Sequence, residues 1–123
     1  MLSCLCVGIG GFVGSVLRYL IGTLSIETAS GFPVKTFVIN IVGAFVLGVV
    51  AQTGASFPAV PREVILMLQV GLCGGFTTFS TFSSEALTLL SQGHVATAFF
   101  YMIASMTLGL AAVFAGGSLV KLF

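Results

Sequence analysis

Charged residues are scarce in this chain. They make up 6% of its 123 residues, whereas an ordinary soluble domain contains about 25%. Hydrophobic residues make up 58% of the chain, and the mean hydropathy is +1.23. This composition excludes an ordinary soluble domain and predicts a protein of the lipid bilayer. The net charge of +1, without a basic cluster, also argues against nucleic acid as a partner.

The chain also lacks the groups of residues on which enzymes and metal sites depend. It has one histidine, and its acidic residues form no pair and no nucleophile–base arrangement, so we expect no enzyme activity. No ATP-binding motif is present, which excludes coupling to ATP hydrolysis by this chain. The cysteines match no zinc or redox spacing and are interpreted as small apolar packing residues (Cys4, Cys6 and Cys73).

Long hydrophobic stretches run through the whole sequence, and each can supply the roughly 20 apolar residues of a membrane span. We therefore predict an all-α membrane protein with four transmembrane helices, in a single membrane domain over residues 1–123. The first stretch has no basic start and no clean cleavage site, so we expect a membrane helix there and not a signal peptide. The predicted helices cover about residues 2–23, 33–53, 62–91 and 94–121.

The few basic residues give no preferred orientation in the membrane. With four helices, Arg62 and Lys121 lie toward one side, and Arg18 and Lys35 toward the other. An orientation bias needs an excess of Lys and Arg on one side. We therefore expect the chain to insert in both orientations, a dual topology.

Small residues at helical spacing predict close approach between helix backbones. One such face contains Gly10, Gly11 and Gly14, and another contains Gly43 and Gly48. These faces serve contacts either within one subunit or between subunits, and spacing alone does not decide which. Because a chain of 12.7 kDa leaves little room to enclose a pathway, we expect a homodimer, antiparallel if both orientations occur.

The segment from residue 71 to residue 83 is unusual for a membrane helix, because hydroxyl and phenyl side chains follow two adjacent glycines. Glycine weakens a helix by about 1 kcal/mol relative to alanine. Hydroxyl groups are tolerated at membrane depth where they pack against protein or line a polar path. We predict that the third helix is broken near its middle, at Gly74-Gly75, and that backbone carbonyls freed there can hold a monovalent cation.

Two phenylalanines after the glycines point to an anion path. Phe79 and Phe82 share a helical face, and the positive edge of a phenyl ring can face a small anion. Neighbouring hydroxyl groups add hydrogen-bond donors, which suits a small, strongly hydrated anion. These hydroxyls belong to Ser80, Thr81, Ser83, Tyr101, Ser105 and Thr107.

Three other polar residues in the predicted spans each have two interpretations. Asn40 either makes a hydrogen bond between helices or donates to an anion in a pore. Arg18 either extends to the lipid headgroups or attracts anions into a vestibule. Glu85 is either a functional ionisable group, or it lies near the water boundary or pairs with a basic residue.

These segments together resemble the Fluc (CrcB-type) fluoride channels, and the resemblance covers nearly the whole chain. Residues 74–83 with Glu85 carry most of its specificity. Two further segments agree with it: residues 10–15 with Arg18-Tyr19 in the first helix, and Asn40 with Gly43 in the second.

The resemblance implies both an assembly and a function. Members of this family are dual-topology antiparallel homodimers with two fluoride pores. They export fluoride passively from the cytoplasm across the cell inner membrane, which lowers its toxicity. The backbone carbonyls of Gly74 and Thr77 from both subunits would hold a central structural sodium ion (Na+), and Arg18 and Glu85 would lie nearer the vestibules.

The resemblance also assigns residues to the pore. Phe79 and Phe82 would line the fluoride path, with Asn40 as the polar pore residue of the second helix. Gly109 lies one turn after Ser105, where a further hydroxyl would be expected. The polar track would consist of Ser80, Thr81, Tyr101 and Ser105.

Two other functions fit the size of the chain. A small dual-topology multidrug exporter would need a membrane-buried carboxylate in its first helix, and residues 1–23 contain no Asp or Glu. An assembly subunit without transport activity would explain the small-residue faces, but it leaves the run of serine, threonine and phenylalanine unexplained. We therefore favour the fluoride channel.

Overall fold

The computed structural model describes residues 1–26 and 28–123. Within these residues the regular structure is entirely helical, as predicted. The third predicted helix is divided into several elements, of which η1 is a π-helix. In chain order the elements are α1 (Leu2–Gly22), α2 (Val34–Ser56), α3 (Arg62–Leu66), η1 (Met67–Cys73), α4 (Gly74–Phe76), α5 (Phe79–Ser91) and α6 (Val95–Val120).

Four segments of the described residues are long and apolar enough to cross a membrane, as predicted: Leu2–Gly22, Val34–Ser56, Arg62–Ser91 and Val95–Val120. The segment Arg62–Ser91, called the third span below, contains α3, η1, α4 and α5. The observed ends differ from the predicted ones by at most three residues, at the end of α2.

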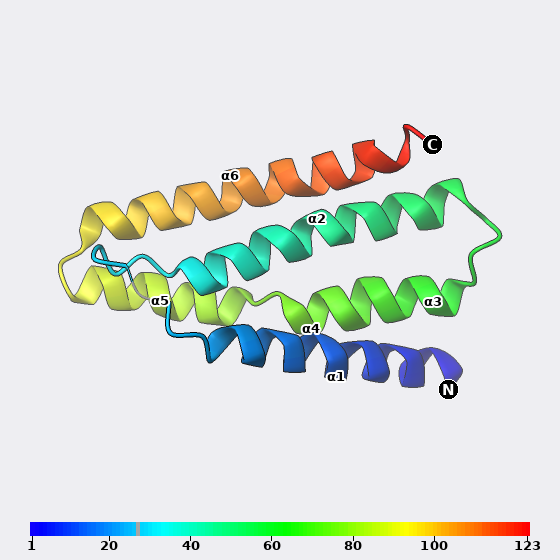
Figure 1. Ribbon diagram of the computed structural model, residues 1–123, viewed down its shortest axis with the longest axis horizontal. Coiled ribbons are helices and arrows are strands. Elements are labelled where there is room, and N and C mark those ends of the chain that lie inside the picture. Colours follow the sequence, from blue (N-terminus) through cyan, green and yellow to red (C-terminus); the bar gives the residue numbers. More distant parts are fainter. Residues whose placement is uncertain (27) are drawn as a thin grey trace.

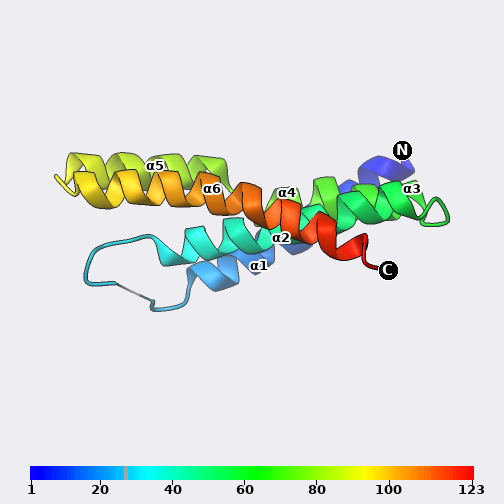
Figure 2. The same ribbon diagram turned by 90° about the horizontal axis from the view of Figure 1, so that it is seen from above.

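The four spans run up and down in alternation, so that both chain ends and the α2–α3 connection lie at the same end of the molecule (Figure 1). In that view α6 lies beside α2, and α1 lies beside the first half of the third span. The contacts agree: α2 packs along α6, α1 packs on η1 and α4, and α5 packs on α6. Figure 2 shows α5 and α6 side by side, with the connection between α1 and α2 at the same end of the molecule.

The connections at the other end are closed by local hydrogen bonds and by glycine. Gly31 (φ 68°) and Gly93 (φ 81°) have the left-handed conformation that a side chain disfavours. Lys35, near the start of α2, donates from Nζ to the carbonyl oxygens of Gly22 (2.9 Å) and Leu24 (3.1 Å). A cation at these carbonyls satisfies the C-terminal end of α1, where the helix dipole is negative.

The interruption of the third span lies later than predicted. Gly74 and Gly75 belong to α4 and are helical, whereas Thr77 (φ −79°, ψ 159°) and Thr78 (φ −152°, ψ 119°) are extended. Thr78 caps α5, because its side chain accepts a hydrogen bond from the amide of Thr81. The prediction at Gly74-Gly75 is therefore wrong by three residues, since a capping threonine, and not weak glycine propensity, sets the position. Thr77-Thr78 is called the break below.

The glycines instead allow α1 and the third span to pack backbone against backbone. A Cβ on Gly14 would lie 2.2 Å from the carbonyl oxygen of Leu72, and a Cβ on Gly71 would lie 2.6 Å from that of Val7. Glycines therefore face each other across this contact from both helices. The face around Gly10 and Gly14 serves packing within one chain, which the sequence left open.

The second small-residue face has the same role between α2 and α6. A Cβ on Gly48 would lie 2.1 Å from the carbonyl oxygen of Val113, and a Cβ on Gly116 would lie 2.2 Å from that of Phe45. Close backbone contact of this kind increases van der Waals attraction where lipid provides no hydrophobic drive. Both pairs of helices in the bundle therefore depend on glycine.

Replacing one of these glycines is expected to destabilise the fold. In Gly14→Ala the new methyl group must push α1 away from Leu72, at a cost of about 1–3 kcal/mol. Gly8→Ala is the matched control, because nothing lies within 4 Å of a Cβ at Gly8. Thermal unfolding in detergent, followed by circular dichroism, should show a lower midpoint for Gly14→Ala only. Equal midpoints would contradict close packing at Gly14.

Candidate functional site

The break is held by a side chain of α2. The backbone amide of Thr78 donates to Oδ1 of Asn40 (2.8 Å), and Nδ2 of Asn40 donates to the carbonyl oxygen of Thr78 (3.1 Å). Asn40 therefore pairs with Thr78 as a neighbouring β-strand would. Of its two interpretations, the hydrogen bond between helices is present, and one N–H of the amide is left for another acceptor.

Close packing brings α2 to the break. Gly43 lies one turn after Asn40 on the same face, and a Cβ there would lie 2.2 Å from Cγ2 of Thr77. A larger residue at position 43 would therefore move α2 away from Thr77 and lengthen the bonds between Asn40 and Thr78.

Arg18 reaches the other side of the break from α1. Its Nε donates to the carbonyl oxygen of Gly75 (3.0 Å), and the side chain is half-buried. This carbonyl lies at the end of α4, where the helix ends without its usual partners. Arg18 is thus attached to the third span, a position that neither of its two interpretations from the sequence included.

Two backbone carbonyls at the break have lost their helical partners. The Thr78 amide donates to Asn40 and the Thr81 amide donates to Oγ1 of Thr78, so neither donates to the carbonyl four residues earlier. Those carbonyls belong to Gly74 and Thr77. Carbonyl oxygens released by an interrupted helix are suitable ligands for a monovalent cation. These two carbonyl oxygens fit the sodium site that the resemblance implies, and the ion itself stays a prediction.

The two phenylalanines lie together just after the break. The ring centroids of Phe79 and Phe82 are 5.7 Å apart and their planes are tilted by 37°. Phe79 is 79% exposed, whereas Phe82 is half-buried and packs on Tyr101, with ring centroids 5.0 Å apart. Phe79 borders an open hollow of about 270 Å³ that includes Asn40, Thr77 and Thr78.

Hydroxyl groups gather at the same place. Oγ1 of Thr78 donates to Oγ1 of Thr81 (3.0 Å) and lies 3.3 Å from Oγ of Ser80. The hydroxyl of Ser83, in contrast, donates to the carbonyl oxygen of Phe79 in its own helix (2.9 Å). The Thr107 hydroxyl does the same with Ile103 (2.8 Å). Ser80 and Thr81 thus belong to the polar cluster at the break.

Glu85 joins three helices. Its Oε1 accepts from the hydroxyl of Thr36 in α2 (2.7 Å), and its Oε2 accepts from the hydroxyl of Tyr101 in α6 (2.8 Å). Tyr101 is completely buried and Thr36 is 6% exposed. Each carboxylate oxygen therefore has a donor inside the bundle. The placement of Glu85 nearer a vestibule stays a prediction.

Ser105 lies one turn after Tyr101 on α6. Its Oγ is buried and has no hydrogen-bond partner among residues 1–26 and 28–123. Buried hydroxyl groups are nearly always bonded, so this one has unused capacity for a ligand. At Gly109, one turn further, nothing lies within 4 Å of a Cβ.

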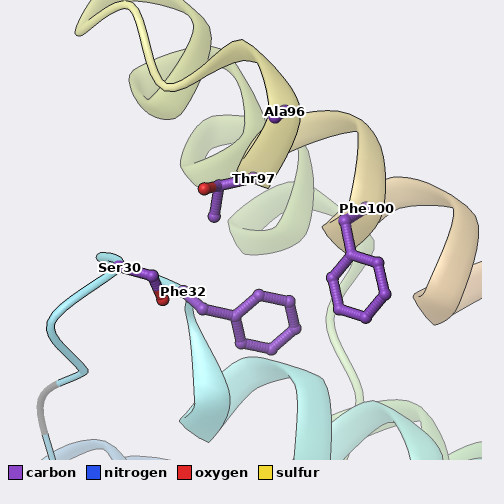
Figure 3. Close-up of a pocket in the computed structure, with 5 residues that line it drawn as sticks. All are labelled: Ser30, Phe32, Ala96, Thr97 and Phe100. Atoms are coloured by element: carbon purple, nitrogen blue, oxygen red, sulfur yellow. The ribbon is translucent and has the colours of Figure 1, made fainter.

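Aromatic rings pack around Tyr101 at one end of the bundle. Figure 3 shows the rings of Phe32 and Phe100 beside a hollow of about 380 Å³, below Ala96 and Thr97 of α6. The centroid of the Phe32 ring lies 5.3 Å from that of Tyr101 and 5.9 Å from that of Phe100. These contacts fix the ring of Tyr101 and thereby the direction of its hydroxyl group.

Two residues of the site, Thr36 and Thr78, were not predicted from the sequence. Thr36 lies four residues before Asn40, on the face of α2 that also contains Gly43, so helical spacing could have found it. Thr78 precedes a new helical start, where threonine is a preferred cap. Both signals were present, but they are common to many helices and point to a site only once the break is located.

The chain is therefore a multi-pass membrane protein with a polar site at an interrupted span. It belongs to the CrcB-like family, because the model described as "CrcB-like protein, Camphor Resistance (CrcB)" matches residues 5–117. The resemblance to the Fluc (CrcB-type) family found in the sequence is confirmed.

Curated relatives match along almost the whole chain. A protein of Chlorobaculum tepidum is 41% identical over 123 residues, which cover 100% of this chain and 98% of the relative. A protein of Phocaeicola vulgatus is 47% identical over 118 residues (94% and 96%), and one of Agrobacterium fabrum is 42% identical over 117 residues (94% of each). All three are named "Fluoride-specific ion channel FluC". They are channels and not enzymes, as expected for this chain.

Removing the hydroxyl of Tyr101 is expected to destabilise the protein. Tyr101→Phe leaves one oxygen of Glu85 without its buried donor, at a cost of about 1 kcal/mol, within the range found for hydrogen bonds in membrane proteins. Tyr19→Phe is the matched control, because Tyr19 is 70% exposed. Denaturant titration in mixed micelles should show a loss of stability for Tyr101→Phe only. Equal stability of the two variants would contradict a stabilising Tyr101–Glu85 bond.

Proposed function

We propose that this chain forms a fluoride-selective ion channel. The observation that carries the proposal is the pair of rings, Phe79 and Phe82, beside hydroxyl and amide donors at the break, 5.7 Å apart between centroids. The relatives named fluoride-specific ion channels support the same function over the full length of the chain.

The chemistry of the site suits fluoride. A small anion enters a pore when donors replace its water, and it leaves again when no single site binds it too tightly. The ring edges of Phe79 and Phe82, the free N–H of Asn40 and the hydroxyl of Ser105 are such donors. They would act in succession, and with Ser80, Thr81 and Tyr101 they form the proposed pore. Arg18 and Glu85 are proposed to act nearer the vestibules.

Transport in this proposal is passive. Fluoride moves down its own gradient, out of the cytoplasm and across the cell inner membrane, which lowers its toxicity. No motif for nucleotide binding occurs in the sequence, so this chain does not couple transport to ATP hydrolysis.

We further propose an antiparallel homodimer with two pores. In one subunit, α5 exposes Phe79 together with the serines at 80, 83 and 84. Hydroxyl groups are not left facing lipid without cost. Both glycine faces already pack within one chain, whereas the surface around the break exposes Phe79 and is available for a second copy. Two-fold symmetry would then place one Phe79–Phe82 pair in each of two equivalent paths.

A structural sodium ion completes the proposal. The carbonyl oxygens of Gly74 and Thr77 from both subunits would hold it at the centre of the dimer. Nothing lies within 4 Å of a Cβ on Gly74, so this side of the break is open toward a partner. A sodium ion held there would supply positive charge between the two interrupted spans.

Fluoride efflux from liposomes tests the channel. Purified protein in sodium-containing buffer should release fluoride rapidly and chloride at the background rate, followed with ion-selective electrodes. Phe79→Ile and Phe82→Ile should each lower the fluoride rate by at least about tenfold, because a branched alkyl group has no positive edge. Phe114→Ile is the control, since Phe114 is 77% exposed and lies on α6, and it should keep the wild-type rate.

The outcomes separate the possible functions. No fluoride release from folded protein would overturn the channel. Equal release of fluoride and chloride would keep a channel but overturn its selectivity. Wild-type rates for both ring variants would remove Phe79 and Phe82 from the pore.

Dual topology predicts a second result. Reporters active on only one side of the membrane, fused to the C-terminus, should both give a signal, because Arg62 and Lys121 are balanced by Arg18 and Lys35. Adding two lysines after Lys121 should shift the signal toward the cytoplasmic reporter. A strong signal from one reporter only would overturn insertion in both orientations.

A further inference from the structure

We infer that Arg18 and Asn40 are positioning residues that hold the break from two sides and keep it extended. The inference goes beyond ion contact, since it assigns both side chains to the backbone of the third span. The effect of these two residues on fluoride transport rests on the proposed function, whereas their effect on the conformation of the break does not.

The break frees backbone groups that a continuous helix would have paired, and side chains from other helices take them up. Arg18 binds the carbonyl oxygen of Gly75 (3.0 Å). Asn40 binds both the amide and the carbonyl of Thr78 (2.8 Å and 3.1 Å). Unsatisfied backbone groups at membrane depth cost several kcal/mol each in lipid surroundings. The extended conformation therefore depends on these partners.

The two residues act on opposite sides of Thr77. Gly75 belongs to α4, at the end of the first half of the third span, whereas Thr78 caps α5 at the start of the second half. Arg18 comes from α1 and Asn40 from α2. Each half of the third span is thus attached to a different neighbouring helix, and Thr77 lies between the two attachments.

Glycine makes the reach of Arg18 possible. A Cβ on Gly75 would lie 2.5 Å from the carbonyl oxygen of Gly11 and 3.1 Å from Oγ of Ser15. Arg18 follows Gly14 by four residues, on the same face of α1. The close approach of the two backbones places its guanidinium directly at the end of α4. The positive charge is also attracted to the negative end of the helix dipole there.

The hydrogen bonds that Arg18 and Asn40 make to the third span decide which of its carbonyls stay free. Gly75 and Thr78 have side-chain donors, whereas the carbonyls of Gly74 and Thr77 do not receive the amides of Thr78 and Thr81. Loss of either side chain would change the conformation of Thr77 and the direction of its carbonyl. It would also move Phe79, the first residue of α5, relative to α2.

Nuclear magnetic resonance of the full-length protein in micelles tests this inference. In wild type, the Cα and Cβ shifts of Thr77 and Thr78 should be those of extended residues. In Asn40→Ala and Arg18→Met these shifts should move away from extended values. Hydrogen exchange of the Thr78 amide with solvent should be about tenfold faster in Asn40→Ala. The variant loses the hydrogen bonds to Asn40 that keep this amide from opening to solvent.

Matched controls separate this local effect from general destabilisation. Gln52→Ala removes a side-chain amide from the same helix as Asn40, where it donates to Oγ of Ser56 (2.8 Å). Arg62→Met removes an exposed positive charge at the start of α3. Both controls should leave the shifts of Thr77 and Thr78 at wild-type values.

Conservative variants keep the test decisive if the larger changes prevent folding. Arg18→Lys retains a donor for Gly75 and should restore the extended shifts. Asn40→Asp retains an acceptor for the Thr78 amide but cannot donate to the Thr78 carbonyl, so the carbonyl shift of Thr78 should still change. Wild-type shifts throughout in Asn40→Ala and Arg18→Met, or in Asn40→Asp if those do not fold, would overturn the inference.

Fluoride efflux measured on the same variants separates this inference from the proposed function. Altered threonine shifts together with slower fluoride efflux support both. Altered shifts in variants of a wild-type protein that releases no fluoride support the positioning role and overturn the channel. Unaltered shifts with slower efflux overturn the positioning role, because Arg18 and Asn40 would then act on the ion itself.

Discussion

The pairing between Asn40 and Thr78 is the interaction on which the functional part of this structure depends. A helix that stops at membrane depth must find partners for the backbone groups that it releases. The amide side chain of Asn40 supplies a donor and an acceptor to one residue, at 3.1 Å and 2.8 Å. The break can therefore stay extended, and Phe79 begins a new helix in a fixed direction.

The rest of the bundle places the helices that make this pairing possible. Facing glycines bring α1 against η1 and α4, and α2 against α6, at backbone contact. This closeness lets Arg18 reach Gly75. On the far side of the break, Glu85 accepts hydrogen bonds from α2 and α6 and so joins α5 to both. Each half of the third span thus has its own polar attachment within an apolar bundle.

The sequence predicted the helices well because long apolar stretches leave few alternatives to a membrane helix. It placed the break three residues too early. Two adjacent glycines are the weakest helix formers in the segment, but both are helical in α4, where Gly75 packs on the backbone of α1 at Gly11. Thr77 and Thr78 are extended because Asn40, far away in the chain, pairs with Thr78. Local propensity contains no information about that distant partner.

The sequence decided the features that are local to a segment, and the tertiary structure decided the contacts between distant residues. Composition and the scarcity of charge determined a four-span membrane protein, and the spacing of Phe79 and Phe82 put an aromatic pair on one helical face, since these properties are local to each segment. Tertiary structure decided that Arg18 binds Gly75, that Glu85 joins Thr36 to Tyr101, and that the glycine faces pack within the chain. Polar side chains in a membrane have several possible partners, and only the packing of the helices selects among them.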